Sequence, residues 1–506
     1  MSDRPDGAAL READSAARAM ALDVEGSFLV QAPAGSGKTE LLIQRYLALV
    51  ARVERPERVL AITFTRKAAG EMRDRVVRAL TAASSDAPAD LAPHERTTRE
   101  LALAVLRQDA RHGWQIVAHP SRLAIRTIDA LAQSIAMQAP LASGMPPSPR
   151  FTEDAQPHYV EAVRSVIAQA RPDDAVWREL LDHQDNNADV LCAQLADMLA
   201  RRDQWLEFVA GHPSRMRETL EATLAQEVEG ELALAGRALR AIDAASLCRI
   251  AALASRHLSD DEAALRDVLG ACATRGGPPP LDVAHLDAWK VIASWVTTKE
   301  GGVYTSATWL KGIPKIRVGT DGADARRADA HITTAWLESL AATPGAKEAL
   351  ATIRRLPPTR YADDEWARIV SVLSLLPALQ ESLLRVFADA GEMDFTQGTL
   401  AALKALGDGD APSELLLRLD LAVDHILVDE FQDTSFAHLD LLRRLMAGWT
   451  EGDGRTIFAV GDPMQSIYRF RGAEVRAFVD AQASNAIEGI AVEPLTLRRN
   501  FRSQAG

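Results

Sequence analysis

Short apolar runs alternate with amphipathic stretches at both ends of the chain. The runs cover residues 27–33, 59–65 and 123–128 near the front, and residues 425–429, 456–461 and 491–497 near the end. Five of them lead into segments with apolar residues at helical spacing. Strands that alternate with helices are typical of a parallel sheet with helices on both faces. We therefore predict an α/β fold.

The middle of the chain has a different pattern. It is rich in Ala, Leu, Arg and Asp, with apolar residues at helical spacing, as at Val190, Leu195 and Leu199. We interpret it as a large, mostly helical insertion within one α/β domain. The expected order is a first part of the domain in residues 1–139, the insertion in 140–390, the second part in 391–488, and the start of a second domain of the same kind in 489–506.

Composition narrows the class of protein. The chain has 506 residues, of which 47% are apolar and 25% charged, which is typical of a soluble globular protein with two or more folded units. The net charge is −13, which argues against binding nucleic acid through general basicity but allows a local basic groove.

Targeting and cysteine signals are weak. The three cysteines are far apart and form no CxxC pair, so neither a disulfide framework nor a zinc or iron–sulfur site is supported. Residues 1–14 are polar and lack the apolar run of a signal peptide. We also see no apolar stretch long enough to cross a bilayer, and therefore expect a cytoplasmic protein without membrane contacts.

A phosphate-binding loop follows the first apolar run. It consists of Ala32, Pro33, Ala34, Gly35, Ser36, Gly37, Lys38 and Thr39. In such a loop backbone N–H groups surround the phosphates, and Gly35 and Gly37 permit their close approach. Lys38 neutralises the outer phosphates, and the Thr39 hydroxyl binds Mg²⁺. A predicted strand precedes the loop and a predicted helix follows it, as a site for ATP or GTP requires. A chance match in a Gly-containing turn is the less probable interpretation.

Two adjacent carboxylates end the run at 425–429. Because side chains alternate along a strand, Asp429 and Glu430 diverge. Asp429 is then suited to hold magnesium, while Glu430 faces the γ-phosphate and acts as general base on the attacking water. The alternative interpretation is an acidic turn that caps the next helix.

A polar loop at 461–473 and an arginine at the end of the chain complete the candidate catalytic set. The amide of Gln465 suits a γ-phosphate sensor, and Phe470 suits stacking on a base. Arg502 suits an arginine finger that stabilises charge on the transferred phosphoryl group. The alternatives are a buried Phe, an Asp-Pro turn and a surface cluster of arginines.

The second apolar run ends in candidate contacts to a nucleic-acid strand. Thr63, Phe64 and Thr65 offer two hydroxyls and an aromatic ring, and two cations follow them. This mixture suits gripping a single strand by its backbone and by stacking. Thr127, at the end of the third run, is a weaker candidate of the same sort.

Together these segments resemble superfamily 1A DNA helicases, the UvrD/Rep/RecB/AddA group. The patterns AxxGxGKT, ITFTxKAAxEM, DEFQDT, GDPxQSIYxFRGA and LxxNFRS occur here in the family's order, and the matches cover about residues 1–135 and 391–506. The resemblance implies a RecA-like P-loop domain. The large insertion, the segment Pro149–Asp154 (PRFTED) and the segment Met393–Phe395 (MDF) are similar to the RecB/AddA branch.

The resemblance also implies a function. It suggests an ATP- and Mg²⁺-dependent motor that moves 3′→5′ on single-stranded DNA, meets duplex DNA, and acts in repair or recombination. A second helicase–nuclease subunit is a further expected partner. Phe501 stands where the family usually has Tyr and would stack on adenine. The residues implied to touch DNA are Thr63, Phe64, Thr65, Thr127 and Phe470, with Arg471 in the loop that couples ATP to DNA.

The chain departs from the family in several places. The N-terminal Gln that reads adenine has no clear counterpart in residues 11–21, and Asp129 stands where relatives often have His. The chain stops at Gly506. We therefore expect a truncated chain that lacks most of the second RecA-like domain and shows little DNA-stimulated turnover by itself. Two other hypotheses stay open, namely a non-catalytic nucleotide-binding scaffold of a repair complex and an RNA-directed motor.

Overall fold

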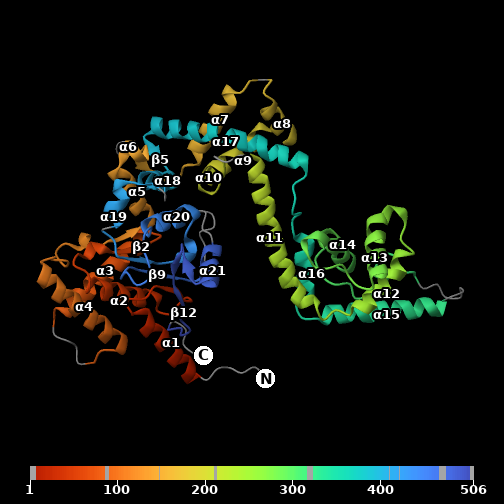
Figure 1. Ribbon diagram of the computed structural model, residues 1–506, viewed down its shortest axis with the longest axis horizontal. Coiled ribbons are helices and arrows are strands. Elements are labelled where there is room, and N and C mark those ends of the chain that lie inside the picture. Colours follow the sequence, from red (N-terminus) through yellow and green to blue (C-terminus); the bar gives the residue numbers. More distant parts are fainter. Residues whose placement is uncertain are drawn as a thin grey trace. The chain divides into compact units, whose positions relative to one another are not determined.

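A computed structural model of the chain forms two compact units (Figure 1). It describes residues 7–85, 90–146, 149–171, 173–209, 213–315, 323–408, 411–420, 422–465 and 475–501. Unit 1 comprises Met1–Glu207 and Leu375–Gly506, and unit 2 comprises Phe208–Ser374.

Unit 1 is built around a six-stranded sheet in the order β12-β1-β9-β8-β2-β3. Its strands are β1 (Phe28–Gln31), β2 (Val59–Thr63), β3 (Ile125–Thr127), β8 (His425–Val428), β9 (Thr456–Gly461) and β12 (Glu493–Thr496). All neighbouring strands pair in parallel. Strands β2, β8 and β9 are buried along their whole length, as expected when helices cover both faces of a parallel sheet.

Helices lie on both sides of this sheet (Figure 1). One side carries α2 (Lys38–Val50), α3 (Arg66–Ala83) and α4 (Pro93–His112), whose apolar residues share a core with β1 and β2. The other side carries α5 (Ile128–Gln138), α18 (Phe395–Leu406) and α20 (Phe436–Leu445). The predicted α/β fold with a parallel sheet is confirmed, and the strands lie within the predicted apolar runs.

The remaining elements of unit 1 are short or peripheral. They are α1 (Gly7–Ala21), η1 (Pro56–Arg58), η2 (Pro120–Arg122), α6 (Pro140–Ser143), β4 (Arg150–Phe151), α7 (Gln156–Gln169), α8 (Ala175–His183), α9 (Ala188–Ala200), η3 (Arg202–Gln204), β5 (Glu392–Met393), β6 (Gly407–Asp408), β7 (Ala411–Pro412), α19 (Glu414–Asp420), η7 (Phe431–Asp433), η8 (Pro463–Gln465), α21 (Val475–Ser484), β10 (Ala486–Ile487) and β11 (Ile490–Ala491). Helix α10 (Leu206–Val209) crosses into unit 2.

The described part of unit 2 is helical apart from an isolated bridge between Thr297 and Val303. Its helices are α11 (Pro213–Leu239), α12 (Ala244–Ser255), η4 (Asp260–Glu262), α13 (Ala263–Arg275), η5 (Val283–His285), α14 (Leu286–Val296), η6 (Ala307–Trp309), α15 (Ala323–Ala342) and α16 (Ala346–Arg355). Three tryptophans, Trp289, Trp295 and Trp336, anchor their shared core.

The units differ from the expected domain boundaries. Unit 2 lies inside the span 140–390 predicted as an insertion, but residues 140–207 and 375–390 cluster with the sheet. The boundaries of the insertion therefore stay a prediction. Residues 489–506 were expected to begin a second domain. In the structure β12 pairs with β1 and forms one edge of the first sheet. The start of a second domain within 489–506 stays a prediction.

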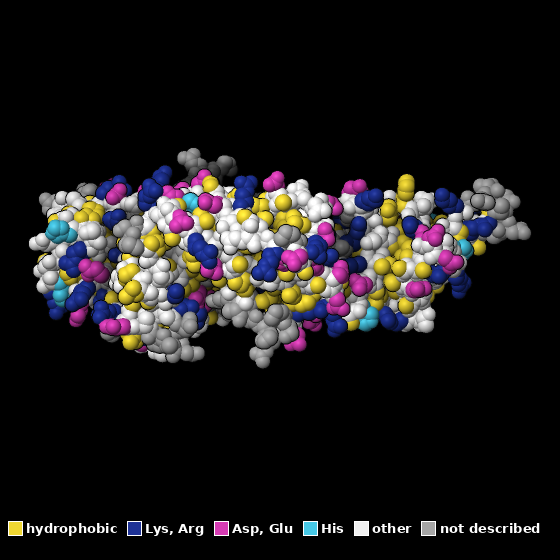
Figure 2. Space-filling model, turned by 90° about the horizontal axis from the view of Figure 1, so that it is seen from above, with side chains coloured by type: hydrophobic (Ala, Val, Ile, Leu, Met, Phe, Trp, Pro, Cys, Tyr) yellow, Lys and Arg dark blue, Asp and Glu magenta, His cyan; other side chains and the backbone are white. Residues whose placement is uncertain are grey.

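One helix corrects the expectation about apolar stretches. Helix α17 (Asp363–Ala390), which runs through both units, is long and apolar enough to cross a membrane by length and composition. Leu376, Leu379 and Leu383 on its second half are fully buried, although only 28% of its most apolar window is buried. On the face drawn in Figure 2, basic side chains are interspersed with acidic ones, which agrees with the absence of general basicity in the sequence.

Candidate functional site

The phosphate-binding loop lies between β1 and α2. Gly35 and Gly37 have φ angles of 80° and 79°, in the left-handed region that favours glycine. Helix α2 begins at Lys38, so its free N–H groups and the positive end of its dipole face this turn. The Ser36 hydroxyl is buried and has no hydrogen-bond partner in the described part of the chain. A buried donor of this kind fits an anionic ligand held by the loop.

The two predicted halves of the site meet at Lys38 and Glu430. The Lys38 ammonium donates to Oε2 of Glu430 at 2.5 Å, and both side chains are partly shielded from solvent. Strand β9 lies between β1 and β8 in the sheet, and the loops after these parallel strands all emerge at the same edge. Topology therefore brings a lysine and a carboxylate together that are 392 positions apart in sequence.

The two carboxylates after β8 have different surroundings. The Asp429 N–H donates to the carbonyl of Ile62 on β2, which continues the sheet by one residue. Burial and the neighbouring Glu430 carboxylate raise the pKa of Asp429 to about 6. Glu430 has a φ angle of 52°, which is uncommon for a residue with a side chain and frequent at functional sites.

The same residues fit a divalent cation. Asp429 has no ion pair among the described residues, and magnesium prefers carboxylate, hydroxyl and phosphate oxygens. Thr39 follows Lys38 in the first turn of α2, which brings its hydroxyl close to the phosphate-binding loop. The described ranges contain no cluster of three or more His, Cys, Asp or Glu side chains that could hold a metal ion. A cation here would therefore need oxygens from a bound phosphate in addition to Asp429 and Thr39.

A glutamine that the sequence analysis did not select joins two loops of the site. The Gln432 amide donates to Glu430 Oε2 at 2.9 Å and accepts from the backbone N–H of Asp462, also at 2.9 Å. Gln465 lies within reach of this link, because its amide donates to the Asp462 carboxylate. The predicted DNA and coupling residues Phe470 and Arg471 lie outside the described residues.

Phe501 lies against the phosphate-binding loop. Its N–H donates to the Gly35 carbonyl at 2.8 Å. The guanidinium carbon of Arg18 lies 5.3 Å from the centre of its ring, and that of Arg499 lies 4.6 Å away. Arg18 also donates to the carbonyl of Ser36. Arg502, the predicted arginine finger, lies outside the described residues.

Asp14 on α1 holds this arrangement together. Its carboxylate is 2% exposed, pairs with Arg18 at 2.8 Å and accepts the backbone N–H groups of Arg498 and Arg499. Burial raises the pKa of Asp14, but the hydrogen bonds from Arg18 and the two backbone groups outweigh it and lower that pKa. From the sequence we identified no residue in 11–21 that would bind the adenine base. The spacing of Asp14 and Arg18, four residues apart on a helix, was the pattern that could have indicated this ion pair.

The side chains at the ends of β2 and β3 that were predicted to contact DNA differ in burial and in the hydrogen bonds that they already make. Thr63 is buried. The hydroxyls of Thr65 and Thr127 accept from Ala68 and Ala130 and so cap α3 and α5. These three hydroxyls therefore have structural roles that compete with a ligand.

Phe64 differs from these threonines because its ring lines a cavity of about 490 Å³. The ring lies edge-on to His438, with 6.1 Å between ring centres. His438 in turn lies 3.7 Å from Asp129, the position at which the family resemblance led us to expect His. The structure thus places the imidazole of α20 close to Asp129.

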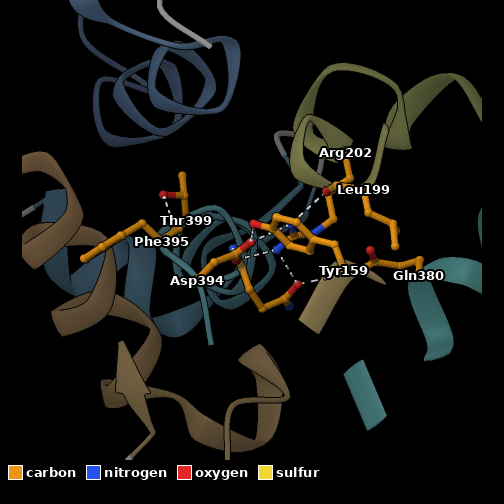
Figure 3. A network of polar contacts seen from close by, with 8 residues as sticks. Tyr159, Leu199, Arg202, Gln380, Asp394, Phe395 and Thr399 are labelled. Atoms are coloured by element: carbon orange, nitrogen blue, oxygen red, sulfur yellow. Dashed lines mark hydrogen bonds and ion pairs between the residues drawn. The ribbon is translucent and has the colours of Figure 1, made fainter. Parts of the chain in front are cut away.

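A buried polar network forms another wall of this cavity (Figure 3). Arg202, which is 0% exposed, donates through both terminal nitrogens to Asp394 at 2.8 and 2.6 Å, and the Tyr159 hydroxyl donates to the same carboxylate. Burial raises the pKa of Asp394, but Arg202 outweighs it and lowers that pKa. Strands β4 and β5 pair beside this network, so the segments Pro149–Asp154 and Met393–Phe395, which sequence analysis grouped, are neighbours.

Comparison with known proteins adds an independent finding. Residues 13–273 and 302–485 match the family described as UvrD/REP helicase N-terminal domain. The chain is 26% identical to an ATP-dependent helicase/nuclease subunit from Pelotomaculum thermopropionicum, over 95% of this chain and 36% of that protein. It is 25% identical to proteins of the same description from Bacillus mycoides and Anoxybacillus flavithermus, over 94% of this chain and 37% and 38% of theirs. The chain thus spans little more than a third of these relatives.

Proposed function

The chain belongs to the UvrD/REP helicase family, and from that premise we propose that it is the ATP-binding part of a DNA helicase subunit that acts in DNA repair or recombination. The observation that carries the proposal is the contact between Lys38 and Glu430. It joins the phosphate-binding loop to the residue best suited to activate water, at the edge of a parallel sheet where nucleotides bind in such folds.

The residues of the site have different roles in ATP hydrolysis. In this proposal the loop from Ala32 to Thr39 binds the phosphates, and Lys38 leaves Glu430 for the phosphate oxygens. Magnesium, held by Thr39 and Asp429, would neutralise charge on the phosphates. Glu430 then accepts the proton of the attacking water, Gln465 senses the γ-phosphate, and Arg502 stabilises the charge that develops.

The base of the nucleotide would lie at the other end of the loop. We propose that it stacks on Phe501, since this ring lies against Gly35 and Gly37. A flat ring beside the phosphate cradle is suited to an adenine base. Arg18 and Arg499 both lie over the ring, so a base that stacks on the face they cover would displace them.

Movement on DNA is the second part of the proposal. Translocation 3′→5′ on single-stranded DNA rests on the family resemblance, with contacts by Thr63, Phe64, Thr65, Thr127, Phe470 and Arg471. Of those that the structure describes, Phe64 is the best candidate because its ring lines a cavity. We further propose a cytoplasmic protein that works with a second helicase–nuclease subunit, which agrees with the description of the relatives as subunits.

A DNA-stimulated ATPase assay on the full-length gene product tests this function. Single-stranded DNA should stimulate hydrolysis, and Lys38→Ala should abolish it because the phosphates lose their cation. Nearly normal hydrolysis by Lys38→Ala would refute the role of the loop. Nucleotide binding without hydrolysis in the unaltered protein would favour a non-catalytic scaffold, and stronger stimulation by RNA than by DNA would favour an RNA-directed motor.

A further inference from the structure

Gln432 connects the ends of two neighbouring strands. It lies in η7, directly after β8, and is 1% exposed. Its amide nitrogen donates to Glu430, and its amide oxygen accepts from Asp462, the first residue after β9. All four residues of β8 pair with β9, from Thr456 to Ala459. A single buried side chain therefore links the residue proposed to activate water with the loop proposed to touch DNA.

The chemistry of the partners fixes the orientation of this amide. The ionised carboxylate of Glu430 only accepts hydrogen bonds, and the backbone N–H of Asp462 only donates. The Gln432 amide therefore has its nitrogen toward Glu430 and its oxygen toward Asp462. Neither Glu nor Leu at this position would satisfy both partners, because glutamine alone among the three carries a donor and an acceptor.

The surroundings leave this link little room to move. A Cβ atom on Gly461 would lie 2.2 Å from the Gln432 amide oxygen, so only a glycine lets the end of β9 come this close. Phe431, which precedes Gln432, is buried and packs on Phe478 of α21, with 6.1 Å between ring centres. A shift of the Asp462 backbone would therefore move the Gln432 amide, because the closely packed surroundings leave no free space around it.

Asp462 also sets the start of the loop that follows it. Its carboxylate accepts from the N–H of Met464 at 3.1 Å and from the Gln465 amide, so the first turn of the loop follows the position of Asp462. At the other end of the link, Lys38 and Gln432 donate to the same oxygen of Glu430. Once Lys38 turns to a phosphate, Gln432 is the remaining side-chain donor to Glu430 within the described ranges.

We propose that Gln432 is a positioning residue that makes the orientation of the Glu430 carboxylate depend on the position of the loop after β9. A strand of DNA that moves this loop would then change the rate of ATP hydrolysis through one amide. This inference rests on the proposed function, since it assumes that Glu430 activates water and that the loop contacts DNA. It adds Gln432 to the residues of that function and names the hydrogen bonds through which the loop acts on Glu430.

Two substitutions in the full-length protein break the link at one end or at both ends. Gln432→Glu keeps an oxygen that can accept from Asp462 but removes the donor to Glu430. Gln432→Ala removes both. The control is Gln44→Glu, because Gln44 on α2 is also buried and donates to Thr98 and to the carbonyl of His94, away from the two carboxylates. The readouts are ATP affinity, kcat without DNA and kcat with saturating single-stranded DNA.

We expect both Gln432 variants to bind ATP with an affinity within about threefold of normal, because neither end of the amide touches the phosphate-binding loop. Gln432→Glu should lower kcat at least about tenfold both with and without DNA, because its carboxylate cannot donate to Glu430 and repels it. Both variants should in addition lower the ratio of the two rates, because each of them breaks the connection between the loop and Glu430. Gln44→Glu should change neither kcat nor that ratio.

The outcomes distinguish this inference from the function on which it rests. Normal kcat values and a normal ratio in folded Gln432→Glu and Gln432→Ala proteins would overturn the role of Gln432 alone. The same holds if ATP affinity falls in parallel with thermal stability while kcat stays unchanged, because that pattern marks a purely structural residue. An unaltered protein whose hydrolysis does not respond to DNA would overturn the proposed function, and this inference with it.

Discussion

The ammonium group of Lys38 lies 2.5 Å from Oε2 of Glu430, so the cation of the phosphate-binding loop is paired with the carboxylate after β8. A bound triphosphate would compete for this lysine with several negative oxygens. Release of Glu430 from Lys38 would leave its carboxylate free to accept a proton from water. The pairing thus gives a physical reason to expect that hydrolysis begins only when the phosphates are in place.

Glu430→Gln should preserve ATP binding and slow hydrolysis. The amide has nearly the same shape as the carboxylate but cannot accept a proton, and loss of a general base lowers kcat by about 10²- to 10⁴-fold. ATP affinity and single-turnover hydrolysis of the full-length protein are the measurements. Unchanged hydrolysis would mean that another group is the base.

Phe64→Ala should weaken binding of single-stranded DNA by about 5- to 150-fold, which corresponds to about 1–3 kcal/mol for loss of stacking on one base. Phe64→Trp should retain most of the affinity. Phe436→Ala is the control, because Phe436 is an exposed phenylalanine that lines a different cavity. Fluorescence anisotropy with a labelled oligonucleotide measures the effect, and equal loss in both alanine variants would argue against a specific role for Phe64.

Arg18→Gln should increase the preference for ATP over GTP. Arginine offers only donors, whereas a glutamine amide can pair with both the amino group and N7 of adenine. Such a pair discriminates by about 1–3 kcal/mol, so the ratio of kcat/KM values should shift by about fivefold or more. Arg11→Gln, an exposed position on the same helix, serves as control. A ratio that is the same in all three proteins would exclude Arg18 from base selection.

His425 should make the protein less stable in mild acid. Burial lowers the pKa of His425 from 6.5 to about 4, and the positive charges of Arg45 and Arg58 add to the effect. Between these two values the unfolded chain binds a proton that the folded chain excludes. The free energy of unfolding therefore falls as pH decreases from 6.5 toward 4, by up to about 1.4 kcal/mol per pH unit.

His425→Gln removes this proton and should flatten the pH dependence over that interval. Urea unfolding at several pH values measures it. His331→Gln, at an exposed position in unit 2, should keep the slope of the unaltered protein. A His425→Gln protein with the same slope as the unaltered protein would show that other groups cause the acid sensitivity.

Local patterns in the sequence determined the elements that carry the site. The strand at 456–461 was predicted to the residue, and a helix was predicted after the phosphate-binding loop, where α2 begins. Both depend on interactions between residues close in sequence. A short apolar run favours a buried strand, and the turn at Gly35 and Gly37 allows a helix to begin at Lys38. Lys38 and the Asp429–Glu430 region were expected to converge on one nucleotide. The structure brings Lys38 to Glu430, because loops that end parallel strands share one edge of the sheet.

Only the tertiary structure decided which polar groups meet. Gln432 is one polar residue among many in its motif until Asp462 comes within 2.9 Å, and Asp14 has no visible role until the backbone of Arg498 reaches it. The strand at 493–496 was predicted, but its place beside β1 rather than in a second sheet was not. The physical reason is that periodicity along a chain reports which side chains are buried, whereas the hydrogen-bond partners come from other segments, 30 residues away for Gln432 and 484 residues away for Asp14.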